Sequence, residues 1–314
     1  MSNPLRAALC GLVALASLAL PLAAPAQADP WLSGRQTLGY GRFFDNDFLG
    51  DNKDRWQTGS YTISVIRGPS WDYELPSRPF EIMEYRAGGG IIAPSRLKNP
   101  SPTDRRYVGR LTFAAHTQFA PLPGAEADLG LGLVAVGPDT GISSLHRTLH
   151  RIFSAPTPAV ADKQLPDQIY PLLTAELGRT LELGWAEARP YVEGRAGDET
   201  LVRAGIDLSF GAREKGALWL RDDVTGHRYV GVSGNVEPQT SFVLGADIAH
   251  VFDSEYFPKA DGVELEPTRK RLRAGVSTRI GGFGIFYGLT WLSEEFKTQP
   301  EGQLTGSLRA RVNF

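Results

Sequence analysis

Acidic and amide side chains gather in a short segment near the start of the chain. Asp45, Asn46 and Asp47 are consecutive, and Asp51 and Asp54 follow closely. Carboxylate and amide oxygens at this density suit a hard cation such as Ca²⁺, which takes about six to eight oxygen ligands. Asp and Asn also favour turns whether or not a metal is bound, and composition alone favours a plain turn over a metal site.

Two histidines lie one helical turn apart in the segment Ile142 to Phe153. His146 and His150 would project from one face of a short amphipathic helix, which Ser143 or Ser144 can cap. The apolar residues that recur at helical spacing in this segment are Ile142, Leu145, Leu149, Ile152 and Phe153. The sequence therefore predicts a helix that carries both imidazoles on one side.

These two histidines permit three interpretations. A histidine can act as a general base because its ordinary pKa lies near neutrality. Paired helical histidines can instead bind zinc, although no Glu lies between His146 and His150, so the metalloprotease motif is absent. In the third interpretation, they are solvated loop residues without a chemical role.

Basic side chains occur on the same helix and in an upstream loop. Arg147 and Arg151 are neighbours on an adjoining helix face. The upstream residues are Arg96, Lys98, Arg105 and Arg106. A guanidinium group can bind phosphate oxygens through two parallel hydrogen bonds, so these residues are candidates for contacts with an anionic headgroup. Ordinary surface charge explains the same residues, and for each one taken singly it is the favoured explanation.

The elements that position these residues are expected to be β-strands, because apolar and polar residues alternate along much of the chain. The last segment, Gly306 to Phe314, alternates throughout and ends in an aromatic residue. Twelve such segments can be counted: 35–44, 60–66, 80–92, 106–119, 128–136, 169–183, 186–195, 201–210, 241–252, 272–278, 285–291 and 306–314. The pattern predicts an all-β fold, a transmembrane antiparallel β-barrel of about 12 strands, closed so that every backbone group in the bilayer is paired.

Connection lengths suggest which end of each strand faces outward. Short turns such as Gly281-Gly282 and Gly184-Trp185 are typical of the periplasmic side, and long polar connections are typical of the outside. The long connections are 45–59, 93–105, 138–168, 211–240 and 253–270. The helix with the two histidines would lie in one of these extracellular loops, against the barrel wall, and could enclose a pocket.

The first 28 residues are expected to be a cleaved signal peptide. Arg6 precedes an apolar run from Ala7 to Leu20, and Ala26-Gln27-Ala28 is a small-x-small cleavage site. Residues 29–314 would form the mature barrel. Cys10 is the single cysteine of the chain, so the mature barrel has no thiol for catalysis or disulfides.

Composition excludes two further classes of protein. No stretch after Asp29 approaches the roughly 18 to 20 apolar residues of a membrane-spanning helix. The formal net charge of −2 argues against a nucleic-acid-binding protein.

The order and spacing of several short segments resemble the outer-membrane lipid A 3'-O-deacylase family of LpxR type. The resemblance spans nearly the whole mature chain. Its segments are Asp45-Asn46-Asp47, Asp54-Arg55, Thr58-Gly59, 92–95, 104–109, 136–139, His150-Arg151-Ile152, 167–169 and 293–296. It implies a twelve-stranded barrel whose site lies between the wall and a loop helix near the outer leaflet, and an enzyme that removes the 3'-linked acyloxyacyl chain of lipid A in a calcium-dependent reaction.

The resemblance also implies roles for individual residues. His150 would be the general base that activates a water against the ester carbonyl. Asn46, Asp47 and a Ca²⁺ ion, with Asp47 as its ligand, would stabilise the oxyanion, and Thr58 would belong to the same catalytic site. Residues expected to bind the substrate are His146, Arg147, Arg151, Lys98 and Arg105. The expected partner is lipopolysaccharide in the outer leaflet, and the expected assembly is a monomer in the bacterial outer membrane.

The sequence departs from the family pattern at two positions. His146 stands where members usually have Gln, and Pro156 stands where the best-known members have Glu. These departures make a catalytically silent barrel, either a scaffold or a narrow pore, the main alternative to an esterase. A calcium-dependent phospholipase with a Ser-His-Asn triad is a weaker alternative, because sequence register does not place Ser209 beside His250.

Overall fold

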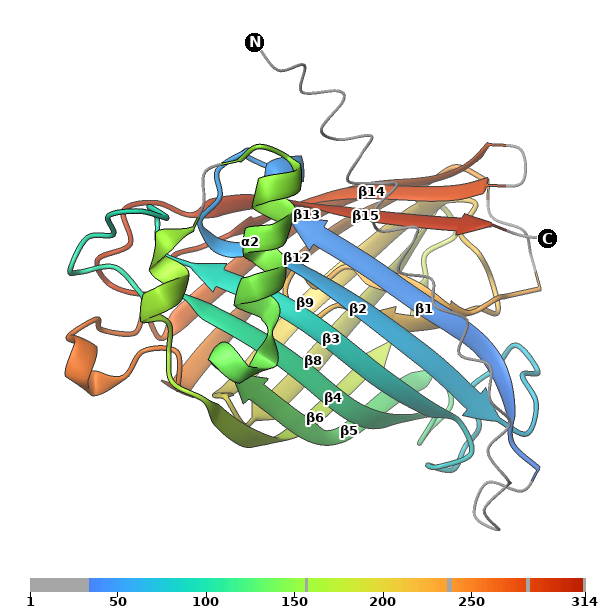
Figure 1. Cartoon of the computed structure of the whole chain (residues 1–314). Helices are drawn as coiled ribbons and strands as arrows, with labels where there is room; N and C mark the ends of the chain where they lie inside the picture. Colours follow the sequence, from blue (N-terminus) through green and yellow to red (C-terminus); the bar gives the residue numbers. More distant parts are fainter. Residues whose placement is uncertain (1–33, 156–157, 236–238, 281–282, 313–314) are drawn as a thin grey trace.

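Twelve long antiparallel strands close into a barrel in the computed structural model, which describes residues 34–155, 158–235, 239–280 and 283–312 (Figure 1). They are β1 (Gln36–Asn46), β2 (Trp56–Gly68), β3 (Met83–Ala93), β4 (Val108–Phe119), β5 (Ala125–Val136), β6 (Gln168–Arg179), β8 (Ala186–Ala196), β9 (Glu199–Gly211), β12 (Ser241–Ser254), β13 (Thr268–Ile280), β14 (Phe283–Leu292) and β15 (Gln303–Val312). Pairing of β1 with β15 and of β6 with β8 closes the sheet. The predicted fold class is confirmed.

Some predicted features fall on parts of the chain that are not described. The signal peptide, Pro156, the Gly281-Gly282 turn and the terminal Phe314 lie outside the described residues. A two-residue strand, β7 (Leu181–Glu182), pairs with β8 beside β6. No helix of the described chain is long and apolar enough to cross a membrane.

The strands alternate between a lipid-facing and a lumen-facing side, as predicted. In β13, Leu272 is 55% exposed, whereas Arg271 and Arg273 on either side of it are buried. Both guanidinium groups pair with the buried carboxylate of Asp247 on the neighbouring strand β12. Burying these three charges is tolerated because opposite charges pair and form hydrogen bonds with one another.

The two ends of the barrel differ. The connections β1–β2, β3–β4, β5–β6, β12–β13 and β14–β15 lie at one end, which we call the loop end. The first and last described residues, and the turn containing Gly184, lie at the opposite end, which we call the terminal end. Because outer-membrane barrels have short periplasmic turns and longer external loops, the loop end corresponds to the outside.

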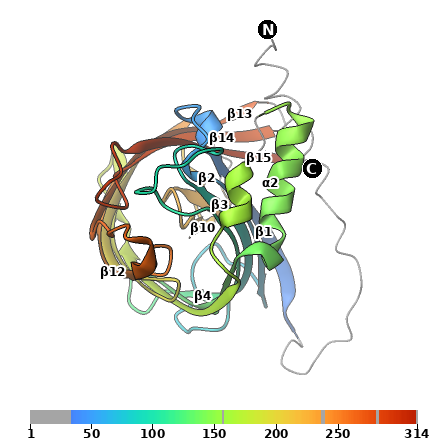
Figure 2. The same ribbon diagram turned by 60° about the vertical axis from the view of Figure 1, so that its left-hand side comes forward.

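The connection 211–240 corrects the sequence prediction, because it leaves the barrel at the terminal end and not at the loop end. It folds back into the lumen as a hairpin of β10 (Leu218–Arg221) and β11 (Arg228–Val232) (Figure 2). Tyr229 stacks on Phe43 of β1 at a centroid distance of 5.3 Å. The segment is long and polar like an external loop, but its buried apolar residues favour the barrel interior.

Helix α2 (Ile142–Ile152) lies outside the barrel wall, across β3 and β4 (Figures 1 and 2). Its first residue, Ile142, is buried against the wall at two glycines. A Cβ atom on Gly109 would lie 2.9 Å from the Cβ of Ile142, and one on Gly89 would lie 3.2 Å from its Cδ1. The helix can therefore approach the sheet closely because these two wall positions have no side chain.

The start of α2 differs from the predicted serine cap. The N-cap is Gly141 with φ of 72°, a left-handed conformation that glycine adopts readily, and no side chain caps the helix. Ser143 is buried inside the first turn and accepts a hydrogen bond from Gln164 at 3.1 Å. The tight turn from the preceding 3-10 helix, η3 (Pro138–Thr140), requires glycine where a capping serine was expected.

Candidate active site

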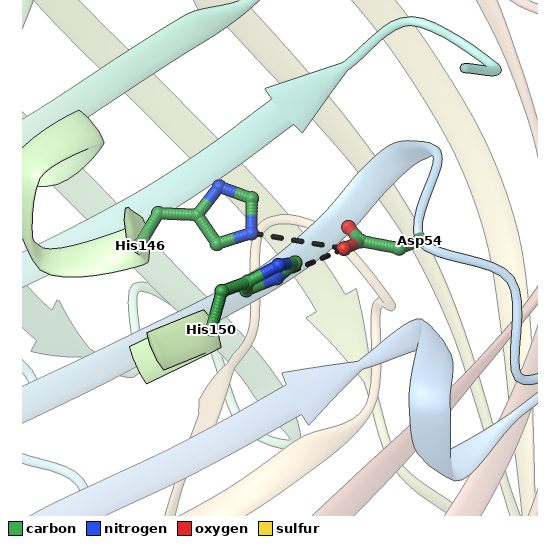
Figure 3. A group of neighbouring side chains, drawn as sticks. All are labelled: Asp54, His146 and His150. Carbon is green, nitrogen blue, oxygen red and sulfur yellow. Dashed lines mark ion pairs between the residues drawn. The ribbon is translucent and has the colours of Figure 1, made fainter. Parts of the chain in front are cut away.

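Two histidines of α2 and one aspartate of the β1–β2 loop meet between the helix and the barrel wall (Figure 3). Nε2 of His150 lies 3.0 Å from Oδ2 of Asp54, and Nε2 of His146 lies 3.8 Å from the same oxygen. The two imidazole rings contact edge to face at a centroid distance of 4.3 Å. The predicted helical spacing therefore does place both rings on one face, and that face is turned toward a carboxylate.

Asp54 was counted among the acidic residues of the candidate cation site, but its position beside the two histidines was not predicted from the sequence. It lies just before β2, in the Asp54-Arg55 segment that supported the family resemblance. Burial opposes ionisation of Asp54, but its interactions with His146 and His150 outweigh burial and hold the pKa of Asp54 well below its ordinary value. The cluster therefore contains an ionised carboxylate beside two imidazoles.

Tyr107 forms the inner wall of the cluster and was missed as a site residue. Its hydroxyl lies 3.1 Å from Nδ1 of His146, and its ring stacks on that imidazole at a centroid distance of 5.9 Å. Burial, reinforced by the negative charge of Asp54, raises the pKa of Tyr107, so the phenol stays neutral. Tyr107 immediately precedes β4, so the barrel wall fixes its position and with it the ring of His146.

Asn46 and Asp47 lie where β1 ends and the 3-10 helix η2 (Asp47–Leu49) begins. The side chain of Asn46 caps η2 by accepting a hydrogen bond from the backbone N–H of Phe48 at 2.9 Å. The carboxylate of Asp47 is buried and accepts a hydrogen bond from the backbone N–H of Arg55 at 2.9 Å. The segment predicted as an acidic loop is therefore an ordered turn that begins within β1.

The charge of Asp47 is destabilised where it lies. Burial, together with the nearby negative charges of Asp54 and Asp51, raises the pKa of Asp47 to about 9. A divalent cation would offset all three effects, and carboxylate oxygens are the ligands that Ca²⁺ prefers. Asp47 is thus a candidate ligand for a hard cation, and the calcium ion stays a prediction.

Thr58 lies within β2, which corrects the sequence prediction that placed it in the long connection 45–59. Pairing of β2 with β3 passes from Gln57 to Gly59 and skips Thr58, so a β-bulge occurs at this position. The hydroxyl of Thr58 is buried, and no hydrogen-bond partner for it occurs among the described residues. Thr58 precedes Gly59, which pairs with Asn46 of β1, and an orphaned buried hydroxyl at this end of the two strands is consistent with a polar ligand.

The predicted substrate-binding cations divide into two groups. Arg147, Arg151 and Lys98 lie at the surface of the loop end, where Arg147 pairs with Asp162 at 2.8 Å. Arg105 is instead buried, paired with Glu295 and positioned 4.7 Å from the ring of Phe257. It therefore cross-links two loops and is not presented to a ligand beside the helix.

The alternative Ser-His pair does not form. On the shared edge of β9 and β12, Ser209 pairs with Val243, whereas His250 pairs with Val202. These positions are seven residues apart along β12, about 23 Å at the rise of a strand. The triad of a serine phospholipase is therefore not present at these residues.

Comparison with known proteins agrees with this arrangement. The family model for the outer membrane protein LpxR matches residues 11–314. The chain belongs to the LpxR family. LpxR from Salmonella typhimurium has the same fold, with a TM-score of 0.70 at 13% sequence identity over 88% of this chain and 100% of that one. The β domain of the Bordetella autotransporter BrkA gives a TM-score of 0.42 at 13% identity over 88% and 99% of the two chains. The sequence matches no curated protein.

Membership in the LpxR family supports an outer-membrane protein that deacylates lipid A. The predicted fold and the predicted family are thereby confirmed. In this chain, α2 lies outside the barrel wall near the loop end.

Proposed function

We propose that this LpxR family member is a calcium-dependent carboxylic ester hydrolase that removes the 3'-linked acyloxyacyl chain of lipid A, with His150 as general base. The observation that carries the proposal is the 3.0 Å contact between Nε2 of His150 and Oδ2 of Asp54 on the outer face of the barrel. A carboxylate that accepts the Nε2 proton fixes the tautomer and stabilises the imidazolium that forms during proton transfer.

The contact with Asp54 determines which nitrogen acts. When Nε2–H donates to Asp54, the lone pair of the neutral ring is on Nδ1, which takes a proton from the attacking water. The water oxygen adds to the acyl carbonyl carbon, and the bond from that carbon to the sugar oxygen then breaks. Nδ1 returns its proton to the departing sugar oxygen, so the histidine ends the cycle neutral.

The turn that contains Asn46 and Asp47 would stabilise the negative charge that develops on the carbonyl oxygen of the ester. A Ca²⁺ ion held by Asp47 would supply positive charge to the carbonyl oxygen as it becomes an oxyanion. The Asn46 amide and the Thr58 hydroxyl belong to the same end of β1 and β2 and would complete the polar surroundings. Asp47 must be ionised to hold the ion, and the cation itself would favour that form.

The location of the cluster suits a lipid substrate. The outer surface of α2 and the neighbouring turn carries exposed apolar side chains, namely Leu145, Ile152 and Phe48. Arg147, Arg151 and Lys98 lie nearby at the surface and would contact the phosphates of the lipid A headgroup. The acyl chains of lipopolysaccharide in the outer leaflet would then contact the apolar side chains. Its headgroup would contact the basic side chains. The hairpin that fills part of the lumen makes a pore a weaker alternative.

The test is hydrolysis of purified lipid A by the refolded protein in detergent, with Ca²⁺ present and with water enriched in ¹⁸O. The expected result is release of an acyloxyacyl acid that carries the label in its carboxyl group, because water attacks the carbonyl carbon. His150→Ala should reduce the rate by about 10²- to 10⁴-fold, the usual contribution of a general base. Lipid A that stays intact with the folded wild-type protein would overturn the proposal.

A further inference from the structure

The cluster of His146, His150 and Asp54 has the donor set of a transition-metal site and not of a calcium site. It offers two imidazole nitrogens and a carboxylate oxygen, all within 4.8 Å of one another. Zn²⁺ is commonly bound by such N and O ligands in tetrahedral geometry, whereas Ca²⁺ requires about six to eight oxygens. The three ligand residues come from two parts of the fold, α2 and the loop before β2.

The distances already match the edges of a small tetrahedron. Ligand atoms about 2.0 to 2.1 Å from a zinc ion lie about 3.3 Å from one another. The two Nε2 atoms lie 3.0 Å and 3.8 Å from Oδ2 of Asp54, values on either side of that spacing. Movements of a few tenths of an ångström would therefore bring the three ligands to bonding distance.

Two polar atoms of the cluster lack the partners that their burial demands. Nε2 of His146 and Oδ1 of Asp54 are buried and have no hydrogen-bond partner among the described residues. His146 is 3% exposed, and Figure 3 shows its Nε2 directed at the carboxylate of Asp54. A buried ring nitrogen without a partner is costly, and a metal ion between the rings and the carboxylate would satisfy both atoms.

Tyr107 supplies the outer-shell contact that metal-binding histidines usually have. Its hydroxyl lies 3.1 Å from Nδ1 of His146 and can accept the N–H of that nitrogen. When Nδ1–H of His146 donates to this hydroxyl, Nε2 of His146 carries the lone pair, as a metal requires.

We propose that Asp54, His146 and His150 form a binding site for Zn²⁺, distinct from the calcium turn at Asp47, and that zinc inhibits the hydrolase. The inhibitory part rests on the proposed function. A zinc ion on Nε2 of His150 requires that nitrogen to carry the lone pair, so its proton moves to Nδ1. The nitrogen that would accept a proton from water is then already protonated, so zinc binding and base catalysis exclude each other.

Zinc binding is tested on the refolded full barrel by calorimetric titration, with Co²⁺ as a spectroscopic probe. We expect one bound ion per chain and a visible absorption band typical of tetrahedral Co²⁺ that Zn²⁺ abolishes. His146→Gln should weaken binding by about 100-fold, and Tyr107→Phe by about 10- to 100-fold. His250→Gln is the matched control, because His250 lies on a distant strand, β12, and should leave binding unchanged.

The inhibition is tested separately with saturating Ca²⁺. Zinc should abolish hydrolysis in the wild-type protein, added Ca²⁺ should not restore it, and the zinc concentration for half inhibition should rise by about 100-fold in His146→Gln, in parallel with binding. Binding without any hydrolysis under zinc-free conditions would defeat the proposed function and leave the zinc site standing. Absence of binding, binding unaffected by both variants, or relief of inhibition by Ca²⁺ would overturn the zinc site.

Discussion

Nε2 of His150 on the loop helix lies 3.0 Å from Oδ2 of Asp54, which belongs to a different loop of the barrel. This contact joins α2 to the loop that precedes β2, on the outside of the wall. It places a fixed carboxylate behind the proposed base, and it does so in a chain that has Pro156 where a Glu was expected. Asp54 thus supplies a carboxylate to the site from another part of the fold.

The first prediction concerns Asp54 as a positioning residue. Asp54→Asn should lower kcat by about 10- to 100-fold with little change in KM, because substrate binding does not depend on the carboxylate. Loss of its negative charge also makes the protonated imidazole less stable, so the acid limb of the pH–rate profile should move to lower pH. Both effects are read from initial rates of lipid A hydrolysis across the pH range.

The control for this variant is Asp162→Asn, which removes an exposed carboxylate that pairs with Arg147 on the same helix. It should leave the acid limb where it is in the wild-type protein. If Asp54→Asn lowers kcat without moving the acid limb, Asp54 has a structural role and does not act through His150.

The second prediction concerns the calcium turn. Removal of divalent cations with EGTA should abolish hydrolysis, and added Ca²⁺ should restore it, because the buried carboxylate of Asp47 lies among other negative charges and fits a cation. Asp47→Asn removes the charged ligand and should raise the Ca²⁺ concentration for half-maximal rate by at least about tenfold. Asp139→Asn, at an exposed position before α2, is the comparison. Full activity in EGTA would rule out calcium.

The third prediction concerns the packing of α2 against the barrel wall. Gly109→Ala would place a methyl group 2.9 Å from Cβ of Ile142 and push α2 outward. A displacement of about 1 Å at the base can cost about 100-fold in rate, so we expect a loss of about 10- to 100-fold with the barrel still folded. Ile142→Gly in the same protein removes that Cβ atom and should recover part of the rate. Gly88→Ala, whose methyl would meet its nearest neighbour at 3.6 Å, should be harmless.

The barrel could be predicted from the sequence because one face of each strand contacts lipid and the other faces the lumen. Apolar and polar residues therefore alternate with a period of two, which is visible in segments such as Gly306 to Phe314. The sequence was also sufficient for α2, since apolar residues recur at helical spacing there. It was not sufficient for the connection 211–240, because an external loop and an inward-folding hairpin share the same polar, glycine-containing composition. The destination of that segment depends on packing against Phe43 and other lumen residues.

At the site, too, the features that depend on local sequence could be predicted, and those that depend on long-range contacts could not. The shared face of His146 and His150 follows from their spacing, and the acidic turn follows from its composition. Asp54 and Tyr107 could not be assigned from spacing, because each reaches the histidines from a separate loop through the closure of the barrel. Arg105 looked like a surface cation, but its ion pair with Glu295 is likewise a long-range contact.

The fourth prediction concerns the charges inside the barrel. Asp247→Ala would leave Arg271 and Arg273 without their shared carboxylate in the lumen. Loss of one member of a buried ion pair costs about 3 to 5 kcal/mol, so the free energy of unfolding in urea should fall by that amount. Asp253→Ala, at an exposed position of the same strand, should change it by less than about 0.5 kcal/mol. Equal effects of the two variants would contradict the proposed lumen network.

The most direct test of the account is mass spectrometry of lipid A from cells that express this chain in a Ca²⁺-containing medium, beside cells that express His150→Ala. The account predicts that lipid A loses the mass of one 3'-linked acyloxyacyl chain with the wild-type protein and keeps it with the variant, at equal amounts of folded barrel. Lipid A that is unchanged in both, or deacylated in both, would contradict it.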